Sequence, residues 1–227
     1  MFCSMAGAAW VKRATAADKS PDELIYLMAK SEMLQVLGRD EEALRLLQGK
    51  VIFFENSAAI RDAVGQLLMH KKEYAQAIDM FRQATILSVD DLTLKDHLGF
   101  ALFYAGRFQE AIEPLQTLAN NEKYAKRSDI LLALARCQIQ TGDLHQARMT
   151  LESAGEIDPK NVDISLTAAQ VALQQNNLGR AELSLHIALT NDPSRPETRL
   201  LLGYLKLKQN HLKDALAEFR RASQLDA

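Results

Sequence analysis

The sequence predicts an all-α protein built from repeated pairs of antiparallel helices. Two observations predict this class: Gly and Pro number only 10 and 5 in 227 residues, and apolar residues recur three and four positions apart. Ala and straight-chain side chains, which are plentiful here, lose little conformational freedom in a helix, so the composition favours helices over strands. A third observation, an internal repeat, predicts how the helices are arranged.

The repeat is marked by six alanines, each just after a predicted turn and at the start of an apolar segment. Successive members of this set, the repeat alanines, are separated by 34, 34, 36, 34 and 34 residues. They are Ala43, Ala77, Ala111, Ala147, Ala181 and Ala215. A fixed period of this length indicates helical units that stack on their neighbours.

Each predicted turn carries a helix-closing residue five positions before its repeat alanine. In five repeats this residue is Gly or Asn, and both tolerate the left-handed backbone that ends a helix. The six residues are Gly38, Lys72, Gly106, Gly142, Asn176 and Asn210. Lys72 is the exception, so we expect a differently shaped or strained turn in the second repeat.

The helical array is predicted to begin near Pro21, because Ser20-Pro21-Asp22-Glu23 offers an N-cap, a first-turn proline and a reciprocal glutamate. We expect a flexible or loosely docked N-terminal segment at 1–20 and one six-repeat domain at 21–227. The repeats span approximately 24–57, 58–91, 92–125, 128–161, 162–195 and 196–227. The centre should be irregular, because the polar stretch 120–128 indicates a longer loop and Pro114 should bend its helix.

Small and large apolar residues occupy fixed places around the repeat alanines. Twelve residues before each stands Ser31, Gly65, Gly99, Ala135, Ala169 or Gly203, and four residues after each stands Leu47, Phe81, Leu115, Leu151, Leu185 or Phe219. This pattern, over about residues 21 to 227, resembles that of the tetratricopeptide repeat family. The resemblance implies a right-handed superhelical solenoid of antiparallel helix pairs, in which the first helix of each pair lines the concave, partner-binding side.

The predicted first helices share a stripe that is unusually apolar for a surface facing water. Large apolar patches rimmed by polar groups mark interaction sites, and the aromatic residues of this stripe concentrate in the third repeat. For Phe103, packing inside the core is an equal alternative. The candidate partner-binding residues are Met69, His70, Asp96, His97, Phe100, Phe103, Tyr104, Arg136, Ile139, Gln170 and Tyr204.

The expected function is that of a protein-interaction scaffold, adaptor or chaperone. An apolar peptide or an amphipathic helix of another protein would sit over Phe100, Phe103 and Tyr104, with Arg136 available for an acidic group. The stripe contains no Asn, unlike the subclass of the family that grips a C-terminal carboxylate with Lys, Arg and Asn. Its apolar character is similar to that of small bacterial tetratricopeptide chaperones and adaptors of secretion or pilus systems.

The alternative function is that of a structural subunit that self-associates, as a homodimer, or docks through its C-terminal edge. The last predicted helix carries Leu216, Phe219 and Leu225 and is followed by no polar helix that would cover it. Terminal repeats need a polar outer face for solubility, so this apolar edge predicts a covering partner.

Catalysis is not expected, and neither is a cofactor. The sequence has no phosphate-binding Gly loop, no HExxH or CxxC spacing and no nucleophile elbow. A remote alternative is a metal-dependent site, in which His70 and His97 approach one another near Asp62 and Asp96. The net charge of −2 leaves no electrostatic footprint for nucleic acid.

The expected location is the cytoplasm. No segment approaches the ~20 apolar residues of a membrane-spanning helix, and the two cysteines, Cys3 and Cys137, are too far apart to indicate a disulfide framework. Cys137 lies in an apolar helical segment and is expected to be a buried, structural thiol. A periplasmic location, or membrane association through the apolar N-terminus, is the alternative.

Overall fold

A computed structural model describes residues 21–226 and shows them folded into α-helices joined by short connections. Twelve helices and no strand occur within this range, which confirms the all-α prediction. The helices are α2 (Pro21–Val36), α3 (Asp40–Gln48), α4 (Ala58–His70), α5 (Tyr74–Leu87), α6 (Leu92–Tyr104), α7 (Phe108–Ala119), α8 (Ser128–Gln140), α9 (Leu144–Ile157), α10 (Val162–Gln174), α11 (Leu178–Asn191), α12 (Pro196–Lys208) and α13 (Leu212–Leu225). The first of these begins at Pro21, as the capping residues predict.

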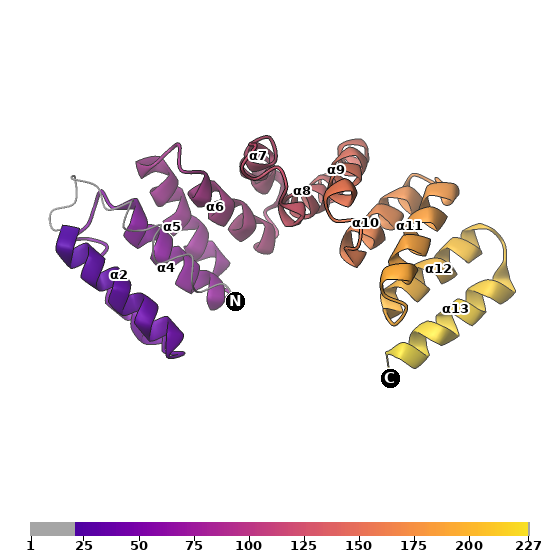
Figure 1. Ribbon diagram of the computed structural model, residues 1–227, viewed down its shortest axis with the longest axis horizontal. Helices are drawn as coiled ribbons and strands as arrows, with labels where there is room; N and C mark the ends of the chain where they lie inside the picture. The colour runs from indigo at the N-terminus through magenta and orange to yellow at the C-terminus, as the bar shows by residue number, and fades with distance from the viewer. Residues whose placement is uncertain (1–20, 227) are drawn as a thin grey trace. The chain divides into compact units, whose positions relative to one another are not determined.

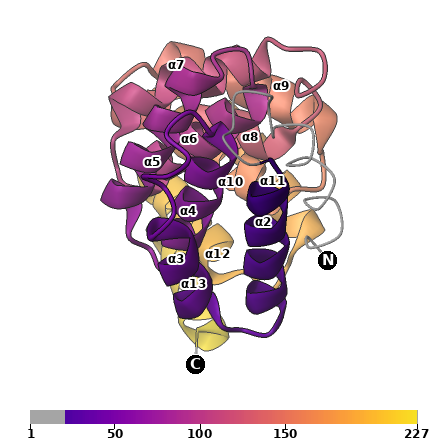
Figure 2. The same ribbon diagram turned by 90° about the vertical axis from the view of Figure 1, so that its left-hand side faces the viewer.

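Consecutive helices pack as antiparallel pairs, such as α2 with α3, α4 with α5 and α12 with α13 (Figures 1 and 2). All six repeat alanines are fully buried, at 0% exposure. Within a pair the helices cross where one lacks a side chain: a Cβ built on Gly65 would lie 2.5 Å from the ring of Phe81. The small and large positions of the repeat therefore meet face to face in the interior.

The turns within the helix pairs share one backbone conformation, including the turn at Lys72. A left-handed φ occurs at Gly38 (69°), Lys72 (61°), Gly106 (73°), Gly142 (87°), Asn176 (55°) and Asn210 (61°). The amide of Lys72 donates to the carbonyl of Met69 at 2.9 Å, as the amide of Gly106 donates to Phe103 at 3.0 Å. The expectation of a differently shaped turn is therefore wrong; the strained alternative holds, because Lys carries a Cβ into the left-handed region.

The chain divides into two compact units, one ending at Pro114 and the other beginning at Leu115. Pro114 lies inside α7, which crosses this division. The residues between α7 and α8 form a connection of turns in which Tyr124 is buried, at 7% exposure. The expected longer loop is present, whereas the single domain over 21–227 stays a prediction.

Each unit has its own apolar interior. In the N-terminal unit Phe81, Ile78 and Leu67 are at most 1% exposed. In the C-terminal unit one cluster joins α8, α9 and α10 through Leu151 and Ile164, and another joins α10, α11 and α12. Cys137 is buried at 0% exposure, as expected.

Two expectations about the membrane and the N-terminus have different outcomes. No helix among residues 21–226 is both long and apolar enough to cross a bilayer. The predicted N-terminal segment, 1–20, with its candidate targeting features, lies outside the described residues and stays a prediction.

Candidate functional site

Five aromatic rings gather at one end of the second and third helix pairs, in the N-terminal unit. Tyr104, at the last position of α6, stacks on Tyr74 of α5 with centroids 6.0 Å apart and lies 6.3 Å from Phe100. Phe103 contacts Tyr104 edge-on at 5.3 Å and Phe108 at 6.1 Å. Such offset and edge-to-face geometries are the favourable ones for aromatic pairs. We call Tyr74, Phe100, Phe103, Tyr104 and Phe108 the aromatic cluster.

The aromatic cluster is partly open to solvent. Tyr104 is 55% exposed, whereas the other four rings are half-buried. Phe103 is thus neither fully core nor fully surface, because it touches both the exposed Tyr104 and Phe108 at the start of α7. Neighbouring rings hold each ring of the cluster in place and leave part of it open to solvent. A partner therefore gains apolar contact area while little side-chain entropy is lost on binding.

Beside the cluster lies a buried acidic group. The side chain of Asp62 on α4 is 3% exposed, and its Oδ1 lies 2.5 Å from Nδ1 of His97 on α6. The second carboxylate oxygen of Asp62, Oδ2, accepts a hydrogen bond of 3.0 Å from the side-chain amide nitrogen, Nε2, of Gln66. The His97 ring also packs against Phe81, with centroids 5.5 Å apart. This pair ties α4 to α6 and fixes the orientation of the first-helix face.

The two candidate histidines have different acidic neighbours. His70, at the end of α4, is exposed and lies with Nδ1 3.6 Å from Oδ2 of Asp40 on α3, while His97 adjoins Asp62. Among residues 21–226, no three His, Cys, Asp or Glu side chains gather in an arrangement that could hold a metal ion. Met69, next to His70, is half-buried, and Asp96, next to His97, is 9% exposed.

In the C-terminal unit the predicted residues lie on α8, α10 and α12. Nη2 of Arg136 lies 3.8 Å from Oδ1 of Asp163, an oxygen that also accepts a 2.7 Å hydrogen bond from Arg195. Tyr204 is 45% exposed, with the ammonium of Lys208 5.5 Å from its ring centroid. Gln170 is exposed, and Ile139 packs against the cluster that joins α8 to α10.

Sequence reasoning missed two members of the aromatic cluster. Tyr74 and Phe108 each open a second helix, three residues before a repeat alanine, whereas the predicted stripe lies on first helices alone. The sequence does contain a sign of these two members, because an aromatic residue occupies the same place in two successive repeats. Only packing shows that the start of a second helix lies beside the end of a first helix.

Two family models, both described as tetratricopeptide repeat, match residues 102–156 and 166–227, which together make up just over half of the chain. No curated protein matches it in sequence. In structure the chain is similar to YrrB, described as a tetratricopeptide protein with an unusual peptide-binding site, with 21% identity and a TM-score of 0.71 over 82% of this chain and 96% of that one.

Two further solved structures are similar in fold. PilF of Pseudomonas aeruginosa has 16% identity and a TM-score of 0.69, over 88% of this chain and 90% of that one. MamA of Desulfovibrio magneticus has 15% identity and a TM-score of 0.57, over 88% and 93%. The repeat alanines, the left-handed turns, the paired helices and both family models agree: the chain belongs to the tetratricopeptide repeat family, whose members are in general non-enzymatic protein-interaction scaffolds.

Proposed function

We propose that this chain is a non-catalytic scaffold that binds an apolar peptide or an amphipathic helix of another protein on the first-helix face of its N-terminal unit. The observation that carries this proposal is the half-open aromatic cluster around Tyr104, which is 55% exposed while it contacts three other rings. Aromatic residues with one exposed face are enriched at the centre of protein interfaces.

The predicted residues around the cluster suit a rim. Met69 adds apolar area beside the cluster, while the exposed His70 and the partly exposed His97 supply polar groups that set orientation. Asp96 is 9% exposed and offers a partner little surface. Since Asp62 holds His97 in place, the polar part of this surface is preformed, and less side-chain entropy is lost on binding.

The first-helix face of the C-terminal unit is proposed as a second, separate contact region. Arg136 shares Asp163 with Arg195, so an acidic group on a partner would compete with this carboxylate for a guanidinium. Tyr204 and Ile139 supply apolar area, and Gln170 supplies an exposed amide.

We also propose that the chain serves a bacterial secretion or pilus system, and the apolar first-helix face supports this proposal. A cytoplasmic location is supported by the free, buried thiol of Cys137. Fractionation of cells that express the full chain tests the location, with recovery in the periplasm as the contrary outcome.

The test of partner binding compares two exposed tyrosines. Tyr104→Asp should abolish capture of specific partners in a pull-down analysed by mass spectrometry, because a charge would be desolvated at the centre of the interface. Tyr26→Asp, at a tyrosine that is 60% exposed on α2, is the matched control and should retain those partners. Circular dichroism checks that both variants fold. Partners retained by Tyr104→Asp would exclude the aromatic cluster as the site.

A second candidate function, self-association through the C-terminal edge, is favoured by a separate observation. Leu212, Leu216 and Leu225 on α13 are 68%, 51% and 42% exposed. A cleft of about 460 Å³ lies between α12 and α13, where Leu200 and Phe219 line it. Light scattering at micromolar concentration should then give the mass of two chains for the native protein and of one chain for Leu216→Glu. A native mass of one chain excludes this function.

A further inference from the structure

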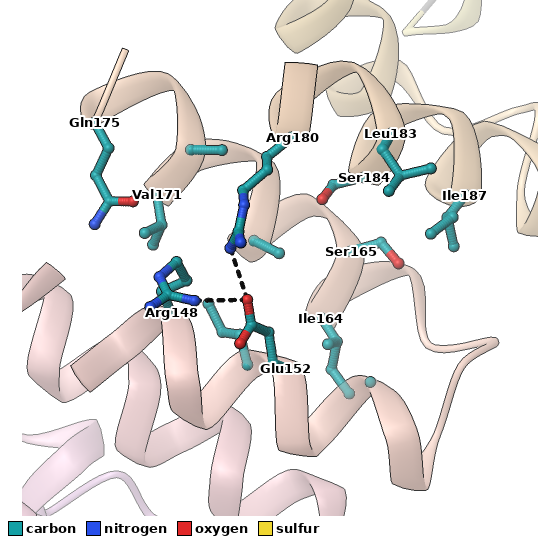
Figure 3. A pocket seen from close by; sticks show the side chains of 14 residues that line it. Arg148, Glu152, Ile164, Ser165, Val171, Gln175, Arg180, Leu183, Ser184 and Ile187 are labelled. Carbon is teal, nitrogen blue, oxygen red and sulfur yellow. Dashed lines mark hydrogen bonds and ion pairs between the residues drawn. The ribbon is translucent and has the colours of Figure 1, made fainter. Parts of the chain in front are cut away.

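A cavity of about 360 Å³ opens on the second-helix side of the C-terminal unit (Figure 3). Its floor is α10, and its walls are α9 and α11. Ile164 and Val171 on the floor are 3% and 1% exposed, and Leu183 on the wall is 62% exposed. A volume of this size, with a mostly apolar lining and a few polar groups, is typical of a binding site.

The cavity exists because two floor residues are smaller than their counterparts elsewhere in the chain. Ala168 and Ala172 stand thirteen and nine residues before their repeat alanine, Ala181. The other repeats carry Lys30, Val64, Leu98, Leu134 and Leu202 at the first of these places, and Leu34, Leu68, Leu102, Gln138 and Lys206 at the second. The fifth repeat alone therefore has Ala at both places, and the space that larger side chains would fill stays open.

A cavity that is open at the surface leaves apolar side chains in contact with water, and these side chains have fewer dispersion contacts on that side than they would in a packed interior. A side chain from another molecule would restore those contacts. Ala168 and Ala172 lie one helical turn apart on α10, on the same face. Two apolar side chains one turn apart on a second helix match this spacing.

The mouth of the cavity carries one net positive charge. Glu152 accepts hydrogen bonds of 2.8 Å from Arg148 and 2.7 Å from Arg180, so two guanidinium groups share one carboxylate (Figure 3). Burial raises the pKa of Glu152, but the hydrogen bonds and charges of Arg148 and Arg180 together lower it by more. The pKa of Glu152 therefore lies below its ordinary value. The side chain of Arg180 is 51% exposed and can reach a second carboxylate.

We propose that this cavity binds an amphipathic helix of a partner protein, which inserts two apolar side chains one turn apart over Ala168 and Ala172 and places an acidic side chain against Arg180. The cavity is separate from the contact region proposed on the first-helix face of the same unit: Gln170 of that region is two residues from both alanines, and hence on another face of α10. A chain with both sites can hold two partners at once.

The test is a selection of helical peptides from a display library. Peptides are selected on the full chain and then depleted on Ala168→Leu/Ala172→Leu, a variant that fills the cavity with residues found at these places in other repeats. Enriched sequences should carry apolar residues three or four positions apart and a nearby Asp or Glu. No enrichment, or enrichment without this pattern, would overturn the proposal.

The best peptide is then synthesised, and its affinity is measured by fluorescence anisotropy. The filled variant should bind roughly tenfold or more weakly, as expected when an apolar pocket is blocked. Arg180→Gln should weaken binding several-fold, and the loss should shrink as salt is added. Ala29→Leu/Ala75→Leu, which adds the same groups at exposed positions, and Tyr104→Asp should bind like the native chain. Equal affinity of the filled variant would refute the proposal.

Leu183→Glu provides a second variant, in case the filled variant does not fold. Leu183 is exposed, so its replacement should leave the melting temperature unchanged while the new carboxylate repels an acidic peptide. Two other occupants are outcomes of the same test. If the mass of the protein in solution falls from two chains to one when the cavity is filled, the occupant is a second copy of the chain. If dodecanoate binds and no peptide does, the occupant is an acyl chain. Either result overturns the proposal of a partner helix.

Discussion

Lys72 shows how strongly the helix pairs impose their turn on the residue that occupies it. Its φ of 61° lies among the values of the Gly and Asn residues in the equivalent turns. An L-residue with a Cβ pays about 1 kcal/mol or more for this conformation. The packing of α4 against α5 therefore outweighs the local preference of the side chain.

We predict that Lys72→Gly stabilises the protein by about 1 kcal/mol, because glycine adopts the left-handed conformation without a steric cost. Chemical denaturation measures the change. The control is Lys71→Gly at the preceding residue, whose φ of −78° is helical; this variant should be destabilised. A lower midpoint for Lys72→Gly would contradict the account of strain.

Cys137 is predicted to be inert in the folded protein. Burial raises the pKa of its thiol to about 12, from an ordinary value of 9.0. In a Cys3→Ser background, which leaves Cys137 as the single thiol, a disulfide reagent at pH 8 should react no faster than the chain unfolds. Rapid labelling under native conditions would contradict this prediction.

The same thiol contributes to the pH dependence of stability. Since its pKa is higher in the folded state than in the unfolded state, its stabilising contribution is complete below about pH 9 and is lost as the pH rises toward 12. In the same Cys3→Ser background, Cys137→Ala should remove this part of the alkaline loss of stability, as measured by denaturation between pH 8 and 10.

At the scale of elements, two helix crossings have the same close approach but different surroundings. A Cβ on Gly65 would lie 2.5 Å from the Phe81 ring, and a Cβ on Gly203 would lie 2.5 Å from the Phe219 ring. Phe81 is 1% exposed and packs against His97, whereas Phe219 is half-buried. Only the second ring has room to move.

We predict that Gly65→Ala destabilises the protein by about 1–3 kcal/mol, and Gly203→Ala by clearly less, because overpacking is costly where the neighbour cannot shift. Gly179→Ala, where a Cβ meets nothing within 4 Å, is the control and should be neutral or stabilising. Thermal melts rank the three variants. Equal losses at Gly65 and Gly203 would show that ring mobility does not set the cost.

At the scale of the molecule, two compact units share one helical repeat. In repeat proteins each repeat is stabilised by contacts with its immediate neighbours. Substitutions in repeats that are not neighbours should therefore change the free energy of unfolding independently of one another. The double variant Gly65→Ala/Gly203→Ala, with one change in each unit, should lower the free energy of unfolding by the sum of the two single losses, within about 0.5 kcal/mol. A strong departure from the sum would indicate coupling between the units.

The sequence by itself determined the class, the period and the five turns that carry Gly or Asn, whereas packing decided the turn at Lys72. The repeat alanines, the Gly and Asn residues of the turns and the capping residues at Pro21 act over a few neighbouring positions, and such local preferences are visible in a linear chain. The same information identified Phe100, Phe103 and Tyr104 as residues of one helix face.

Tertiary structure decided which side chains from different helices meet. It placed Tyr74 and Phe108 beside the predicted aromatic residues, paired His97 with Asp62, and engaged Arg136 with Asp163. It also left a cavity over Ala168 and Ala172, which appear in the sequence as two ordinary helical alanines. The reason is physical: contacts and cavities depend on what the neighbouring helices supply, and that is fixed only when the helices pack.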